Sequence, residues 1–166
     1  MVQTKRSSKK TVNDGLRFIG KFRIQMGENT PDGKIKIVGD SGWRKNQIVN
    51  LGWQDYIMAT IGKVAGSKQI TDMAIGTGTA PASNGTGLNG ETGTRVTTAN
   101  ATVGSFTLRC TGEWASGSHP GGTPSIANLG LFNTSAAGTL MCGNTFNSSA
   151  WNSNQGVSCT YEIQKA

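Results

Sequence analysis

The sequence predicts an all-β protein, a two-sheet β-sandwich of the jelly-roll or immunoglobulin-like kind with one short helix near residues 51–62. The 166 residues include 24 Gly, 20 Thr, 14 Ser and 13 Asn, a mixture that favours short strands joined by turns. Apolar and polar residues alternate along several segments, whereas a single segment has helical spacing. The length suits one domain with a core, which we place at residues 17–166 after a basic arm at residues 1–16.

The first predicted strand follows the arm, because apolar residues at every second position over residues 22–26 alternate with Lys, Arg and Gln. A turn over residues 29–33 leads into a second alternating segment at residues 34–37, so the two segments are predicted to form a hairpin. Its outward cations are expected to continue the basic surface of the arm. These cations are Lys21, Arg23, Lys34 and Lys36.

The next elements are a short strand at residues 46–50 and the predicted helix. Trp53, Ile57 and Ile61 recur at four-residue spacing, which is typical of the buried stripe of a helix. We therefore expect this stripe, including Trp53, to face the core.

Residues 76–94 form a Gly/Thr-rich stretch that is long for a structureless loop within one domain. We expect it to extend over a neighbouring subunit or to carry binding contacts. The strands that follow complete a set of eight or nine. The clearest of them is the last, where Val157, Cys159, Tyr161 and Ile163 are predicted to point inward.

Positive charge is concentrated in the N-terminal quarter. Residues 1–45 hold eleven Lys or Arg and four Asp or Glu, which equals the whole net charge of +7. A basic segment ahead of a neutral body indicates an acidic partner, either a protein surface or nucleic acid. The candidate docking residues are Lys5, Arg6, Lys9, Lys10, Arg17, Lys21 and Arg23.

No catalytic, cofactor or metal site is predicted. His119 is the only histidine and lies in a turn-rich segment without an acidic neighbour that would orient it as a base. The three cysteines, Cys110, Cys142 and Cys159, lie in predicted strands and are expected to be buried, reduced thiols. The Gly76–Thr79 segment lacks the lysine of a phosphate-binding loop. We also expect neither a signal peptide nor a membrane span.

Four tryptophans are many for a chain with 7% aromatic residues. Trp43, Trp114 and Trp151 are candidates for interface aromatics, since Trp is enriched at protein contacts and can also serve as a platform for a sugar or receptor. Core packing is the alternative for these three residues.

Several motifs occur in an order found in one group of viral proteins. Asn46-x-Ile-Val-Asn50-x-Gly52 is followed by Ile75-Gly-Thr-Gly-Thr-Ala80, by Leu88-x-x-Glu91-x-x-x-Arg95, by Leu129-Gly-Leu-Phe132 and by Gly138-Thr-Leu140. From about Asn46 to Ile163 the chain resembles a family of small virion structural proteins of tailed bacteriophages, which are either head-decoration or tail-associated. The family usually has an acidic residue where this chain has Asn128, so a charge pair at that position is not expected here.

The resemblance implies a β-rich, non-catalytic virion component that forms a homo-oligomer, with a trimer as one expected order. We expect a capsid decoration (cement) protein that is assembled in the host cytoplasm and anchored on the head lattice by its basic arm. A tail or tail-fibre component that contacts the receptor is one alternative, and a genome-enclosing coat protein with a nucleic-acid-binding arm is another. The expected partners are the major capsid protein or tail proteins, with nucleic acid as an alternative partner of the arm and no membrane.

Overall fold

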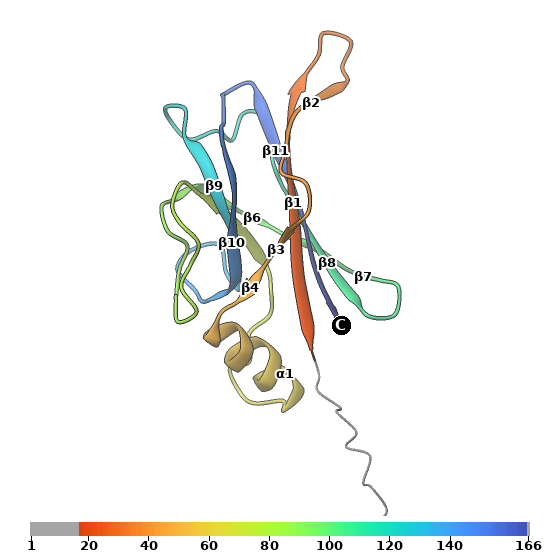
Figure 1. The fold of residues 1–166 in the computed structure, drawn as a ribbon, viewed down its shortest axis with the longest axis vertical. Helices are drawn as coiled ribbons and strands as arrows, with labels where there is room; N and C mark the ends of the chain where they lie inside the picture. Colours follow the sequence, from red (N-terminus) through yellow and green to blue (C-terminus); the bar gives the residue numbers. More distant parts are fainter. Residues whose placement is uncertain (1–16, 166) are drawn as a thin grey trace, which may run out of the picture.

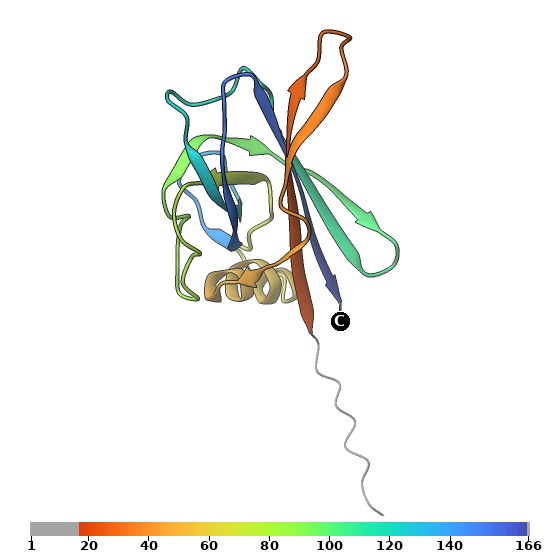
Figure 2. The ribbon, with the colours of Figure 1, turned by 45° about the horizontal axis from the view of Figure 1, so that its top comes forward.

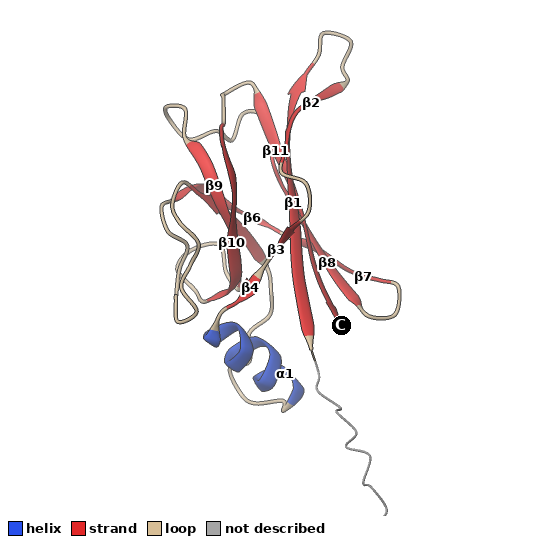
Figure 3. Ribbon diagram, in the orientation of Figure 1, coloured by secondary structure: helices blue, strands red, loops and turns tan. Residues whose placement is uncertain are grey.

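A computed structural model describes residues 17–165 and shows two antiparallel sheets with one short helical segment, as predicted (Figures 1 and 3). The arm at residues 1–16 lies outside the described residues. The first sheet runs in the order β2 (Ile35–Asp40), β1 (Phe18–Asn29), β11 (Gln155–Lys165), β8 (Thr107–Trp114) and β7 (Ala99–Val103), and β3 (Arg44–Lys45) also pairs with β1. The second sheet runs in the order β4 (Gln47–Ile48), β10 (Leu140–Ala150), β9 (Ser125–Phe132), β5 (Asp72–Gly76) and β6 (Glu91–Thr97).

The core lies between the two sheets and is built by the alternation that the sequence predicts. On β1 the inward residues Phe22, Ile24 and Met26 are buried, and on β11 the whole predicted inward set is buried. Phe22 is opposite Tyr161 in the antiparallel register, and their rings stack with centroids 6.0 Å apart. Such cross-strand pairs are the local unit of sheet stability.

The described chain contains eleven strands, more than the eight or nine expected. β3 and β4 have two residues each, which is too short to show any periodicity in sequence. β6 and β7 are mostly exposed and therefore lack a regular apolar face. Their strand conformation depends on pairing with neighbours that are distant in sequence.

The predicted helix is present as a wide π-helical segment, η1 (Gly52–Met58), that continues into a short regular turn, α1 (Ala59–Ile61). Tyr56 anchors it, because its buried ring carries a hydroxyl that donates to the carbonyl of Thr139. Trp53 is half-buried and packs against Phe18 with ring centroids 5.9 Å apart, whereas Ile61 is 68% exposed. The prediction that the whole stripe faces the core is therefore wrong for Ile61, which lies at the end of the helical segment. Among residues 17–165, no helix has the length and apolar character needed to span a bilayer.

The Gly/Thr-rich segment between β5 and β6 folds back onto its own chain. The Thr77 and Gly78 amides donate to the carbonyls of Gly90 and Asn89, which continues the β5–β6 pairing into the loop. Farther along the loop, the Ser83 carbonyl accepts a hydrogen bond of 2.7 Å from the Asn50 amide. These contacts anchor the loop on its own chain.

The first hairpin is present, but its faces differ from the expectation. Ile35 and Ile37 share the outer, solvent-facing side of the first sheet with Gly27 and remain 68% and 50% exposed. Lys36 is opposite Glu28 and therefore lies on the other side from Lys21 and Arg23. The hairpin projects past the second sheet (Figures 1 and 2), so no core covers either of its faces.

The three cysteines are free, buried thiols, as predicted. Burial raises the pKa of Cys110 to about 12 and raises the pKa of Cys142 and Cys159 strongly. The thiols are therefore protonated at neutral pH and act as small apolar side chains.

Candidate docking surface

Half of the cationic residues of the folded body are neutralised by neighbouring carboxylates. Residues 17–165 contain twelve Lys or Arg, and six of them form ion pairs with carboxylates in the same region. Six have no ion pair with a described residue, and three of these lie together at the Phe18 end of β1: Arg17, Arg44 and Lys45. Half of the cations without a described ion pair therefore lie beside the start of the folded chain.

Pairing of β3 with β1 builds this surface. Lys45 is directly opposite Lys21, and Arg44 is opposite Phe22. Arg17 and Lys45 line one small groove of about 240 Å³ together with Trp53. Lys21 Nζ lies 4.8 Å from the ring centroid of Trp43, within the range of a cation–π contact. We call Arg17, Lys21, Trp43, Arg44 and Lys45 the docking surface.

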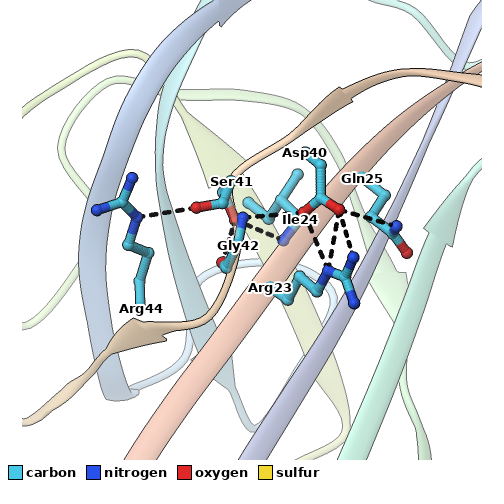
Figure 4. Close-up of polar contacts among 7 residues, drawn as sticks. All are labelled: Arg23, Ile24, Gln25, Asp40, Ser41, Gly42 and Arg44. Atoms are coloured by element: carbon cyan, nitrogen blue, oxygen red, sulfur yellow. Dashed lines mark hydrogen bonds and ion pairs between the residues drawn. The ribbon is translucent and has the colours of Figure 1, made fainter.

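A hydrogen-bond network holds the turn that carries Trp43 and Arg44 (Figure 4). Asp40 accepts hydrogen bonds from the Arg23 guanidinium, from Gln25 at 3.2 Å and from the Gly42 amide at 2.9 Å. The hydrogen bonds from Arg23 lower the pKa of Asp40 to about 2, so the carboxylate is charged at neutral pH.

The same turn is tied to β1 through Ser41. The Ile24 amide donates to Ser41 Oγ at 2.9 Å, and the Ser41 amide donates back to the Ile24 carbonyl at 2.9 Å. Arg44 Nε in turn donates to the Ser41 carbonyl at 2.9 Å. The backbone of the docking surface is thus preorganised, which lowers the entropic cost of binding a partner.

Two of the predicted docking residues form internal ion pairs. Arg23 pairs with Asp40, and Lys21 pairs with Glu162 at 3.0 Å. Burial raises the pKa of Glu162, but hydrogen bonds from Arg109 and Lys21 outweigh this effect, so the pKa lies below its usual value. Of the other predicted cations, Arg17 is exposed, whereas Lys5, Arg6, Lys9 and Lys10 lie outside the described residues.

The three candidate interface tryptophans divide into two groups. Trp43 is 45% exposed and lies at the docking surface. Trp114 and Trp151 are in the core instead, and their indole N–H groups donate to the carbonyls of Thr94 at 2.9 Å and Gln155 at 2.8 Å. Burial with a satisfied N–H leaves these two rings no surface to offer a partner in this structure.

Arg44 and Lys45 were not among the residues singled out from the sequence. Their charges were visible there, but only the pairing of β3 with β1 places Lys45 next to Lys21. The Asn144 side chain of the second sheet also donates to the Lys45 carbonyl at 3.0 Å and fixes this segment from the opposite side.

The spacing of Leu88, Glu91 and Arg95 has a structural explanation. Arg95 forms a two-point ion pair with Glu91 at 2.7 and 2.9 Å, and its guanidinium lies 3.5 Å from the ring centroid of Phe132. Leu88 packs with Phe132 and Leu140 in a second, smaller apolar cluster. These motif residues therefore stabilise one side of the second sheet and do not form an exposed site.

His119 is also engaged in packing. Its ring meets Trp151 edge to face at 5.3 Å, and its Nε2 is 2.6 Å from the Trp151 carbonyl. Within residues 17–165, no three His, Cys, Asp or Glu side chains are grouped as a metal site would require.

No known protein-family model matches the chain, and no curated protein or solved structure shows significant similarity to it.

Proposed function

We propose that the chain is a non-enzymatic structural protein of a tailed-phage particle, and specifically a head-decoration protein that attaches to an acidic lattice through its basic N-terminal end. The observation that carries the proposal is the docking surface itself. Three cations without a described counter-charge lie on a preorganised surface, directly after a 16-residue segment that adds four more cations. A partner with an acidic surface is complementary to both.

Two further features support a structural role. His119, the histidine of the sequence, packs against Trp151, and the three cysteine thiols are buried and protonated. The resemblance to phage virion proteins supports the virion as the location and a homo-oligomer as the working form. The major capsid protein is the partner that this proposal requires.

The test compares variants for attachment to phage heads that lack this chain. We expect removal of residues 1–16 to abolish attachment and leave the isolated domain folded. We expect Arg44→Gln with Lys45→Gln to weaken attachment about tenfold, because two charges at the contact are lost. Added salt is expected to weaken attachment of the unmodified chain.

The matched control is Lys36→Gln with Lys63→Gln, which removes the same charge from exposed positions that are not part of the docking surface. This control is expected to attach as the unmodified chain does. Equal losses of attachment in both double variants would show that net charge, and not the docking surface, controls attachment. Full occupancy of the heads by the truncated chain would overturn the anchoring role of the arm. Circular dichroism of each variant confirms that the fold is retained.

Imaging of labelled chain in purified particles distinguishes the head from the tail. We expect label distributed over the head surface. Label confined to the tail would support the tail or tail-fibre alternative in its place.

The exposed Trp43 specifically favours a second candidate, a coat protein whose arm contacts the genome. An exposed indole beside cations is able to stack on a base while the cations meet phosphates. Nucleic acid that co-purifies with the chain and is lost as salt increases would support this candidate. Binding to heads in the presence of nuclease, with no co-purifying nucleic acid, would support decoration.

A further inference from the structure

An apolar groove lies on the outer face of the first sheet, at the base of the projecting β1–β2 hairpin. Its volume is about 560 Å³, and the exposed side chains of Ile35 and Ile37 form one wall. Gly27 and Gly156, which are opposite each other on β1 and β11, form its floor. A Cβ at Gly27 would come within 2.5 Å of Ile35 Cγ2, so the absence of side chains there keeps the floor open. We call this site the hairpin groove.

A single carboxylate without a described ion pair stands on the far wall of the hairpin groove. Glu113 on β8 lines the groove and is exposed. The other carboxylates of residues 17–165 are paired with cations or accept side-chain hydrogen bonds, as Glu28 does from Gln155 and Asp72 from Thr71. The groove thus combines an apolar wall with an available negative charge.

The opposite end of the same sheet carries a complementary feature. Phe106, in the turn between β7 and β8, is 69% exposed, and Lys165 Nζ lies 5.5 Å from its ring centroid. Lys165 has no ion pair with a described residue. Figures 1 and 2 show the β1–β2 and β7–β8 hairpins projecting at opposite ends of the first sheet. We call Phe106 with Lys165 the aromatic knob.

We infer that the aromatic knob of one copy of this chain occupies the hairpin groove of a second copy, with Lys165 facing Glu113. The ring would cover the exposed isoleucine wall, and burial of aromatic and aliphatic surface drives such contacts. A groove of this size lies in the range that accommodates a compact apolar group. Lys165 beside the aromatic knob is positive and Glu113 in the hairpin groove is negative, so the two charges are complementary.

The contact between copies is head-to-tail. If the hairpin grooves of two copies faced each other, Glu113 of one copy would lie against Glu113 of the other. If the two aromatic knobs faced each other, Lys165 would lie against Lys165. Repulsion between like charges disfavours both arrangements. Groove and knob lie at opposite ends of one sheet, so we infer a heterologous contact that generates a ring or an open chain of subunits. An unmodified chain that stops at a dimer would instead indicate a reciprocal two-fold contact, and it would overturn the head-to-tail arrangement. It uses none of the docking-surface residues. It specifies the homo-oligomer of the proposed function, but loss of this contact would leave attachment through the docking surface untouched.

The test is sedimentation velocity of the purified full chain over a range of concentrations, without phage particles. We expect the unmodified chain to form species larger than a dimer. Ile37→Glu blocks the groove and Phe106→Ser removes the knob, and each variant alone is expected to sediment as a monomer. An equimolar mixture of the two is expected to form a 1:1 heterodimer and nothing larger, because one intact groove and one intact knob remain.

Each alternative gives a different result. Self-association of the Ile37→Glu variant would show that the hairpin groove is not part of the contact. Self-association of the Phe106→Ser variant would show that the aromatic knob is not part of it. A mixture that stays monomeric, or an unmodified chain that is monomeric at every concentration, would overturn the inference. Val64→Ser, which alters another exposed apolar residue, is the control and is expected to assemble normally.

Charge reversal tests the pairing of Lys165 with Glu113. We expect Glu113→Lys or Lys165→Glu alone to weaken association about fivefold, which is the upper range for an exposed ion pair. A chain that carries both reversals is expected to regain association, because each contact again joins opposite charges. No recovery in the double variant would contradict this pairing.

Discussion

Asn128 shows how one side chain orders the Gly/Thr-rich loop. It is fully buried on β9, and its amide nitrogen donates to the carbonyls of Thr79 at 3.0 Å and Asn89 at 2.8 Å. Both partners are acceptors, so the position requires a donor, which an ionised carboxylate cannot supply. The buried site therefore fits an amide side chain and would not fit an ionised carboxylate.

We predict that Asn128→Asp lowers the free energy of unfolding at pH 7 by about 3 kcal/mol, because an unpaired charge would face two carbonyl oxygens in the core. Urea denaturation measures the change. Asn147→Asp, at an exposed position, is the control and is expected to shift stability by less than about 0.5 kcal/mol.

The same variant has a defined pH dependence. Burial favours the neutral acid, so the folded-state pKa of an aspartate at position 128 lies above its unfolded value. The folded variant then binds the proton more tightly, and its deficit relative to the unmodified chain shrinks as pH falls. A deficit that is constant with pH would contradict this explanation.

At the scale of elements, the helical segment η1 depends on close contact with the second sheet. Gly52 begins η1 and lies against the backbone of β10, where a Cβ would overlap the Met141 carbonyl oxygen. The Val49 amide donates to the same carbonyl at 3.1 Å, so this oxygen is already held in place. The start of the helix is therefore fixed by backbone packing.

Gly52→Ala is expected to destabilise the fold by about 3 kcal/mol, since overlap with a backbone atom forces the helix or the strand to move. Thermal unfolding followed by circular dichroism measures the loss. Gly117→Ala is the matched control, because an added methyl group there meets no atom within 4 Å. Equal stability of the two variants would show that η1 shifts without cost.

At the scale of the whole molecule, the sandwich encloses all three thiols and leaves charge at its edges. Cys110, Cys142 and Cys159 lie in the main core cluster between the sheets. Reaction of such thiols requires opening of the sandwich, because the thiolate is both inaccessible and disfavoured by burial.

We predict that a thiol-specific reagent at pH 8 labels all three cysteines of the chain unfolded in denaturant. Over the same reaction time, it is expected to label no cysteine of the folded chain. Mass spectrometry counts the labels. Rapid modification of any one cysteine under native conditions would show that the core opens locally at that strand.

The sequence alone determined the fold class, the inward faces of β1 and β11 and the place of the helix. These features are local, because alternation and four-residue spacing are properties of neighbouring positions. Burial of the cysteines also followed from their place in such strands. The charge excess near the N-terminus was equally visible in the residues themselves.

Tertiary structure decided which patterned faces are covered. Ile35 and Ile37 alternate with polar residues as Phe22 and Ile24 do, yet they stay exposed because their register with β1 places them on the outer face of the first sheet. Trp114 and Trp151 are buried because strands from distant parts of the chain close over them. Lys45 reaches Lys21 only through strand pairing. Periodicity shows which side chains share a face, whereas only the packing of remote segments determines whether that face meets water.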